Sequence, residues 1–222
     1  MQYPTISEYV KASQDAGDNL DMSTKATAEE LNEAIIDEFG VKYSKDGRKL
    51  LKAPQNLDGT YSIKEGVRII CDNAFESCTS LSSLVISDSV AGIVIPDGVT
   101  SIGDYAFSSC RSLTNIVIPD SVTSIGDHAF EGCYSLYSIV IPDSVTSIGN
   151  HAFEDCYSLT GIVIPDGVTS IGNEAFWGCT SLSSLVIPDG VTSIGDYAFG
   201  ECNFPYNLRQ ELISRFGRNF FG

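Results

Sequence analysis

One phrase of the sequence recurs at a fixed interval of 23 residues, and this recurrence limits the fold more than any other feature. One copy, at residues 118–136, reads Ile-Pro-Asp-Ser-Val-Thr-Ser-Ile-Gly-Asp-His-Ala-Phe-Glu-Gly-Cys-Tyr-Ser-Leu. A constant period of about 20–50 residues is typical of solenoids, in which each repeat is too small to bury its own apolar face and packs on its neighbours. We therefore expect one elongated array. The phenylalanine of the phrase falls at Phe107, Phe130, Phe153, Phe176 and Phe199.

Within one repeat, the residue pattern predicts a short strand, a turn and a second extended segment. Ile116–Ile118 alternates as a half-buried strand does, with the isoleucines inward and the central valine outward. Pro119 ends this strand because its ring fixes φ and its nitrogen carries no proton. Val122 and Ile125 are expected to point inward from the second extended segment. Asp127 is expected to cap a very short helix.

The pattern IPDxVTSIGxxAFxxCxSLxxI resembles the BspA-like leucine-rich repeats, and the resemblance covers about residues 57–203. It implies an α/β repeat solenoid, in which a right-handed curved array carries a parallel sheet on its concave side and short helices or turns on the other sides. It also implies a non-enzymatic role in adhesion or protein binding, although a fold does not by itself define a function.

The remaining sequence predicts how the array begins and ends. We expect a flexible segment at 1–22, an N-terminal cap with a helix and a hairpin at 23–56, and the solenoid at 57–203. An irregular insertion of nine residues near 87–95 interrupts the period, either as a protruding loop or hairpin or as a remnant of duplication. Residues 204–222 are expected to form a C-terminal capping helix, since solenoids need polar-faced ends.

Two local signals support the N-terminal cap. A capping box at Thr27–Glu30 predicts a helix that continues to Phe39 and covers the first coil with its apolar side chains. The sequence Asp46-Gly47 predicts the turn of a hairpin over residues 41–53.

The cysteines predict a column of small buried thiols. Disulfides between neighbouring coils are disfavoured because side chains in a ladder point in parallel, which holds their Cβ atoms apart. A straight column also does not converge on a metal ion. Six of the seven cysteines occupy one repeat position, namely Cys78, Cys110, Cys133, Cys156, Cys179 and Cys202.

The charge distribution argues against two classes of partner. The chain carries a net charge of −16, and residues 67–203 hold only Arg68 and Arg111 as basic residues against sixteen acidic ones. Such a body repels phosphate groups, so we expect neither nucleic acid nor membrane insertion. Residues 1–21 lack the basic start and apolar run of an export signal. The protein is therefore expected in the cytoplasm if Met1 is the native start, and at the cell surface or secreted if the chain is a trimmed piece.

One constellation keeps a metal hypothesis open. The residue two places before the phenylalanine is His128, His151 and Glu174 in three successive repeats, and these side chains are ligand types for zinc or iron. A ladder across three coils is wide for one ion, so solvated surface residues explain the same pattern. No nucleophilic triad, phosphate loop or dinucleotide motif accompanies them. We therefore predict no cofactor and no enzymatic activity, with a metal-dependent enzyme or metal-binding protein as the alternative.

The predicted ligand-binding residues lie in two sets. An outward valine in each strand would form an apolar row beside polar residues, although outward valine is also simply favourable in a sheet. Aromatic residues at positions that vary between repeats are of the types favoured in binding hot spots. The expected partner is a protein, with a peptide or glycan as variants. The predicted residues are Val117, Val140, Val163, Val186, Asn115, Tyr134, Tyr157 and Trp177.

Overall fold

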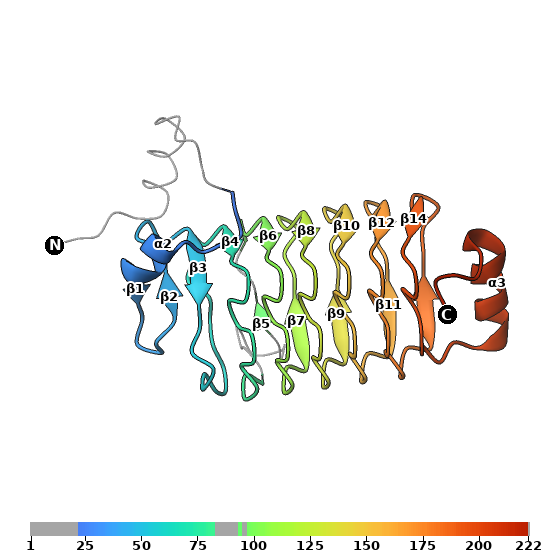
Figure 1. The fold of residues 1–222 in the computed structure, drawn as a ribbon, viewed down its shortest axis with the longest axis horizontal. Coiled ribbons are helices and arrows are strands. Elements are labelled where there is room, and N and C mark those ends of the chain that lie inside the picture. The colour runs from blue at the N-terminus through green and yellow to red at the C-terminus, as the bar shows by residue number, and fades with distance from the viewer. Residues whose placement is uncertain (1–21, 83–92, 95–96, 222) are drawn as a thin grey trace.

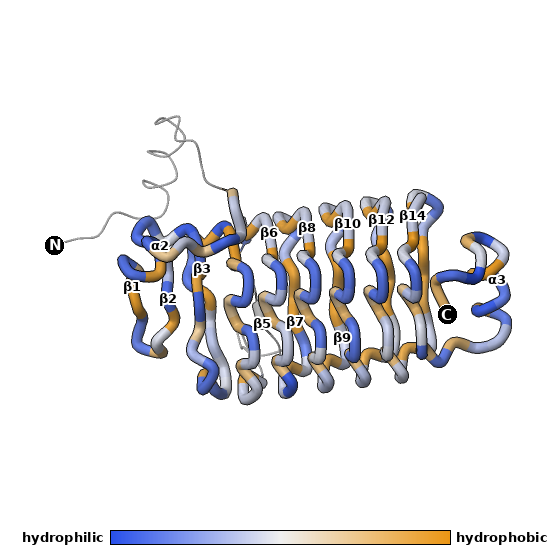
Figure 2. Tube along the Cα trace, viewed as in Figure 1, coloured by the Kyte–Doolittle hydropathy of each residue, from blue (hydrophilic) through white to orange (hydrophobic). Residues whose placement is uncertain are grey.

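In the computed structural model, which describes residues 22–82, 93–94 and 97–221, the chain forms an elongated parallel β-solenoid (Figure 1). The short strands of successive coils lie side by side along the array (Figure 1). Figure 2 shows that apolar segments recur at the same place in successive coils. The predicted flexible segment 1–22, except Met22, lies outside the described residues. So does the predicted insertion near 87–95, except Ile93–Val94.

The second extended segment of each repeat forms the longer of the sheets. Nine strands pair in the order β1-β2-β3-β4-β6-β8-β10-β12-β14, and neighbours from β3 onward are parallel. On its surface, the threonine hydroxyls from Thr123 to Thr192 each donate a hydrogen bond to the carbonyl of the threonine one coil earlier, as Thr146 does to Thr123 over 3.4 Å. The repeated strands are β4 (Ile69–Ile70), β6 (Ser101–Ile102), β8 (Ser124–Ile125), β10 (Ser147–Ile148), β12 (Ser170–Ile171) and β14 (Ser193–Ile194).

The strand predicted at Ile116–Ile118 is observed one residue earlier, at Asn115–Val117, and its counterparts form a second side of the solenoid. These strands pair in parallel as β5-β7-β9 and as β11-β13. Together with the second extended segment predicted at Val122 and Ile125, they give the repeated coils strands on two sides. The strands of this side are β5 (Ile93–Val94), β7 (Asn115–Val117), β9 (Ser138–Val140), β11 (Gly161–Val163) and β13 (Ser184–Val186).

The third side of each described coil consists of turns, so the short helix predicted at Asp127 is absent there. The backbone N–H of Phe130 donates to the carbonyl of Ala152 in the next coil over 2.8 Å, and the same bond recurs along the array. The Asp127 carboxylate caps no helix. It accepts a hydrogen bond from the backbone N–H of Asn150, one coil later, over 2.7 Å. In the same way, Oδ1 of Asn150 accepts a hydrogen bond from the backbone N–H of Asn173 in the following coil over 2.9 Å, so these side chains tie neighbouring coils together.

The core is a single file of phenylalanine rings beside a column of thiols. From Phe75 to Phe199, neighbouring ring centroids are 5.1–5.3 Å apart and the ring planes differ by no more than 7°. The predicted cysteine column is buried and its thiols are free. The Cys133 thiol donates to the carbonyl of Phe107 over 3.2 Å, and later cysteines repeat this bond. Because each ring stacks on the ring of the adjacent coil and each of these thiols bonds to the backbone of the coil before it, stability depends on stacking.

The N-terminal end differs from the prediction. The capping box at Thr27 and Glu30 is present, but helix α2 spans only Ala28–Asn32. The chain then forms β1 (Ile35–Ile36), which pairs antiparallel with β2 (Lys42–Tyr43). The predicted helix to Phe39 is wrong because the β-branched Ile35–Ile36 pair joins the sheet instead. Two apolar side chains assigned to that helix are exposed to solvent instead of covering the first coil, Ile35 by 49% and Phe39 by 53%.

The rest of this end extends the solenoid sheet. Strand β2 pairs antiparallel with β3 (Lys49–Lys52) across a turn at Asp46-Gly47, and β3 pairs in parallel with β4. The ammonium group of Lys49, only 5% exposed as a residue, lies 3.1 Å from a carboxylate oxygen of Glu30. This ion pair holds α2 against β3.

The C-terminal end closes the array with a helix and an aromatic tail. Helix α3 spans Tyr206–Phe216, within the residues 204–222 assigned to the C-terminal cap, and buries Leu212. The Arg215 guanidinium donates to the carbonyls of Ile187 and Pro188 and binds Asp189, which fastens α3 to the last coil. After the helix, the carbonyl of Phe220 accepts from the N–H of Phe199 over 2.8 Å. The tail thus supplies the hydrogen bond that a further coil would have made.

Candidate binding surfaces

The outward valines form an exposed row on four successive coils, here called the valine stripe (Val117, Val140, Val163 and Val186). Their exposed fractions are 37, 66, 63 and 57%. Parallel register places Val140 beside Val117, and Val186 beside Val163. The strands expose these side chains because the alternate residues, Ile139 among them, point into the core. An exposed row of branched aliphatic side chains offers apolar surface and no hydrogen-bonding group.

Small residues lie beside the valine stripe, two positions earlier in each strand, and they are polar in β7, β9 and β13 and glycine in β11. The predicted Asn115 is half-buried, while Ser138 and Ser184 are exposed. Tyr137, 60% exposed, directly precedes β9 and was missed by sequence reasoning. Its position holds threonine or serine in the neighbouring repeats, so the same comparison between repeats that singled out Tyr134 would have found it.

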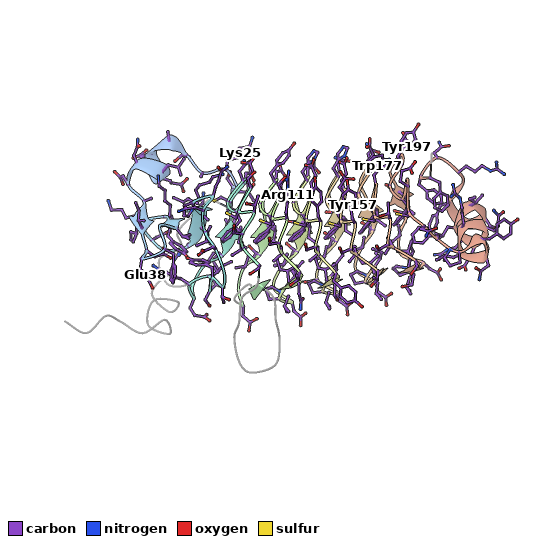
Figure 3. The ribbon with its side chains drawn as sticks, turned by 90° about the horizontal axis from the view of Figure 1, so that it is seen from below. Lys25, Glu38, Arg111, Tyr157, Trp177 and Tyr197 are labelled. Atoms are coloured by element: carbon purple, nitrogen blue, oxygen red, sulfur yellow. The ribbon has the colours of Figure 1, made fainter. Side chains whose placement is uncertain are left out.

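The predicted aromatic residues lie in the turn segments, where Tyr134 and Tyr157 form a stack of their own. The ring of Tyr134 stacks on that of Tyr157 with centroids 4.9 Å apart, and the Arg111 guanidinium lies over Tyr134 at 5.2 Å. Figure 3 shows Arg111, Tyr157 and Trp177 in successive positions toward the C-terminal end. The valine stripe comes from strands and these rings come from turns, so the predicted residues do not form one compact cluster.

Trp177 lines a cavity of about 620 Å³ at the C-terminal end of the array. Its indole lies against Gly200 in the next coil, where an added Cβ would stand 2.6 Å from the indole Cδ1. Tyr197, Arg209 and Phe221 also line the cavity, with the Arg209 guanidinium 4.4 Å from the centre of the Phe221 ring.

The two histidines lie in a second row of stacked rings on the turn side. The centroids of Tyr105 and His128 are 4.4 Å apart, those of His128 and His151 are 4.5 Å apart, and the planes are parallel within 5°. All three residues have positive φ, between 54° and 57°. This left-handed turn conformation repeats from coil to coil, so it aims the side chains in the same direction.

Each imidazole is paired with a glutamate three residues later in its own turn. Nδ1 of His128 lies 3.0 Å from Oε2 of Glu131, and Nδ1 of His151 lies 2.6 Å from Oε2 of Glu154. Burial raises the pKa of the Glu154 carboxyl, and the hydrogen bond from His151 opposes this shift. These glutamates hold the rings in one orientation.

This geometry changes the predicted set of metal ligands, His128, His151 and Glu174, by replacing Glu174 with Glu154. Donor atoms of His128, His151 and Glu154 all lie within 4.8 Å of one another. Glu174 is peripheral, with its Oε2 3.8 Å from Nδ1 of His151. The third potential ligand is therefore within the turn of His151 rather than on the next coil.

Comparison with known proteins agrees with the repeat architecture. The model of the BspA type leucine rich repeat region matches residues 56–93 and 87–205 in six copies. No curated protein gave a match. Among the described residues, no helix combines the length and apolar character needed to cross a membrane.

Three solved structures illustrate the likeness. A leucine rich cell surface protein from Faecalibacterium prausnitzii is 34% identical, with a TM-score of 0.62 over 69% of this chain and 39% of that one. A leucine-rich repeat protein from Bacteroides ovatus is 35% identical, with a TM-score of 0.58 over 76% of this chain and 42% of that one. The leucine rich repeat protein of T. pallidum is 25% identical, with a TM-score of 0.59 over 89% and 99%. The match thus spans about two fifths of the length of the first two proteins.

Proposed function

This chain belongs to the BspA-type leucine-rich repeat family, and from that premise we propose that it is a non-enzymatic scaffold that binds another protein through the valine stripe. The observation that carries the proposal is the exposure of four valines on successive coils, with Val140 in register beside Val117 and Val186 in register beside Val163. Contiguous exposed apolar surface is a common mark of protein interaction sites.

The chemistry of the stripe favours a protein over a glycan as partner. Valine side chains offer no hydrogen bond to sugar hydroxyls, whereas they pack well against apolar side chains. The flanking Ser138 and Ser184, together with Tyr137, supply the polar and aromatic rim that protein interfaces use.

The proposal includes an adhesion-type role at the cell surface. The F. prausnitzii protein is described as a cell surface protein, which supports this location for the present chain. The buried thiols are compatible with an oxidising exterior, because burial limits their access to oxidants.

The test compares two triple lysine variants. In the first, Val140, Val163 and Val186 become lysine. In the matched control, the exposed Thr123, Thr146 and Thr169, which directly precede β8, β10 and β12, become lysine, which adds the same charge. Immobilised proteins capture partners from extracts of the organism that produces the chain, and quantitative mass spectrometry compares the captured sets.

We expect a protein that binds the wild type and the threonine control and is lost from the valine variant. Far-ultraviolet circular dichroism verifies that both variants remain folded. Capture that is unchanged in a folded valine variant would reject the valine stripe as the binding surface.

A further inference from the structure

We propose that His128, His151 and Glu154 form a binding site for a divalent transition-metal ion of the zinc, nickel or copper class. This site is separate from the valine stripe and independent of the protein-binding proposal. Two imidazoles and one carboxylate are ligand types that suit these ions.

The first argument is proximity. The three donor atoms lie within 4.8 Å of one another. With zinc–nitrogen bonds of about 2.05 Å, two nitrogens on one tetrahedral ion are about 3.3 Å apart. The parallel rings, 4.5 Å between centroids, must therefore tilt toward each other by about 1 Å at their nitrogens. Rotation about two side-chain bonds in each histidine provides this movement without moving the backbone.

The second argument is preorganisation. The side chains of His128, His151 and Glu154 are only 22, 26 and 20% exposed, so much of their rotational freedom is already lost. Stacking on Tyr105 restrains the ring of His128 from the other side. Less conformational entropy therefore remains to be lost when an ion binds.

The third argument is the surrounding charge. Glu131 and Glu174 lie beside the trio, each paired with one of its histidines. The two arginines of residues 67–203 are engaged elsewhere, Arg111 over the ring of Tyr134 and Arg68 at the carbonyl of Gly98. The local field therefore favours a cation. Three protein ligands leave at least one coordination position for water or for a donor group of another molecule.

The test is isothermal titration calorimetry of tag-free protein with zinc chloride in a non-chelating buffer. Wild type is expected to bind one ion per chain. The central variant is His151→Tyr, because tyrosine occupies the same position at Tyr105 and Tyr197 with the same positive φ. This substitution keeps an aromatic ring and the turn while it removes the ligand. We expect it to weaken binding by about tenfold or more.

A charge-matched pair separates coordination from general electrostatic attraction. Glu154→Gln and Glu201→Gln each remove one negative charge from the turn side, but only Glu154 belongs to the trio. Glu154→Gln is expected to weaken binding, and Glu201→Gln is expected to leave it unchanged.

A spectroscopic measurement provides an independent readout. With one equivalent of copper(II), the electron paramagnetic resonance spectrum of the wild type should show hyperfine coupling to imidazole nitrogens, and the coupling should diminish in His151→Tyr. The proposal is overturned if wild type shows no saturable one-to-one binding, or if folded His151→Tyr binds zinc as tightly as wild type. Equal weakening by both glutamine variants would also overturn it.

Discussion

The Sγ atom of Cys156 donates a hydrogen bond to the carbonyl oxygen of Phe130, one coil earlier, over 3.3 Å. The two columns at the centre of the solenoid are therefore joined, because each thiol from Cys110 to Cys202 donates to the backbone carbonyl of a core phenylalanine. The same bond links Cys179 to Phe153 and Cys202 to Phe176. Cysteine thus serves here as a small buried side chain with one weak donor.

Cys156→Ala is expected to lower the free energy of unfolding by about 1–2 kcal/mol, because it removes this bond and leaves a small cavity. Urea denaturation followed by circular dichroism measures the change. Thr160→Ala, at an exposed position of the same coil, is the control and should change stability by less than about 0.5 kcal/mol. Equal effects of the two substitutions would contradict the role assigned to the thiol.

The buried thiols predict a loss of stability at alkaline pH. Burial raises the pKa of the Cys133 and Cys202 thiols to about 12, and that of Cys78 to about 11. In the unfolded chain these thiols titrate near pH 8.5. Between these values the unfolded state has released protons that the folded state retains, so stability is complete below about pH 8.5 and declines as pH rises toward 12.

Each thiol contributes up to about 1.4 kcal/mol per pH unit to this decline. Thermal unfolding from pH 7 to pH 11 measures it, and Cys133→Ala should show a shallower decline than wild type. The same slope in both proteins would show that groups other than this thiol cause the alkaline loss.

The close approach of neighbouring coils predicts that substitution by alanine destabilises the protein to different extents at two glycines. A Cβ at Gly149 would lie 2.6 Å from the backbone carbon and oxygen of Gly126, in a space that a side chain cannot share. Gly149→Ala must push the coils apart and should cost about 3 kcal/mol or more. At Gly132 an added Cβ would lie 3.4 Å from its nearest neighbour, the Ser109 Oγ, which is an ordinary contact. Only the positive φ of 67° disfavours alanine there, so Gly132→Ala should lower the free energy of unfolding by about 1 kcal/mol. Urea denaturation of both variants tests this order, and a larger loss in Gly132→Ala would reverse the interpretation.

The side-chain bonds of Asn150 predict a role in holding coils together. Its Oδ1 accepts from the N–H of Asn173, and its Nδ2 donates to the Asp127 carboxylate over 3.2 Å. Asn150→Ala should therefore cost about 1–2 kcal/mol in the free energy of unfolding. Asn207→Ala, at an exposed position of α3, is the comparison and should be close to neutral. A neutral effect at Asn150 would mean that water replaces these bonds without loss.

Much of the solenoid was predictable because its contacts are periodic. Once residues 23 apart were expected to be neighbours, the file of Phe130 and Phe153, the burial of Cys156 and the exposure of Val140 followed from position in the repeat. The alternation within each strand was enough to place the valine row on the surface, although its role in binding stays a prediction.

Contacts within a turn were not predictable in the same way. The comparison of equivalent positions in successive repeats led to Glu174 as the partner of the histidines, whereas Glu154 in the turn of His151 is closer. Asp127 was expected to cap a helix in its own repeat, but its carboxylate bonds to the next coil. In both cases the outcome depends on the left-handed turn at positions such as His151, which the residue types did not reveal.

The amino-acid sequence alone determined that identical units stack and which side chains form each buried column, because a strict period makes every unit bury its apolar residues against a copy of itself. Tertiary structure alone decided which donor and acceptor atoms meet across and within the coils, and where the helix after Thr27 stops. Those choices depend on directions set by backbone turns and by competing strand pairing, and directions of this kind are properties of the assembled chain rather than of residue order.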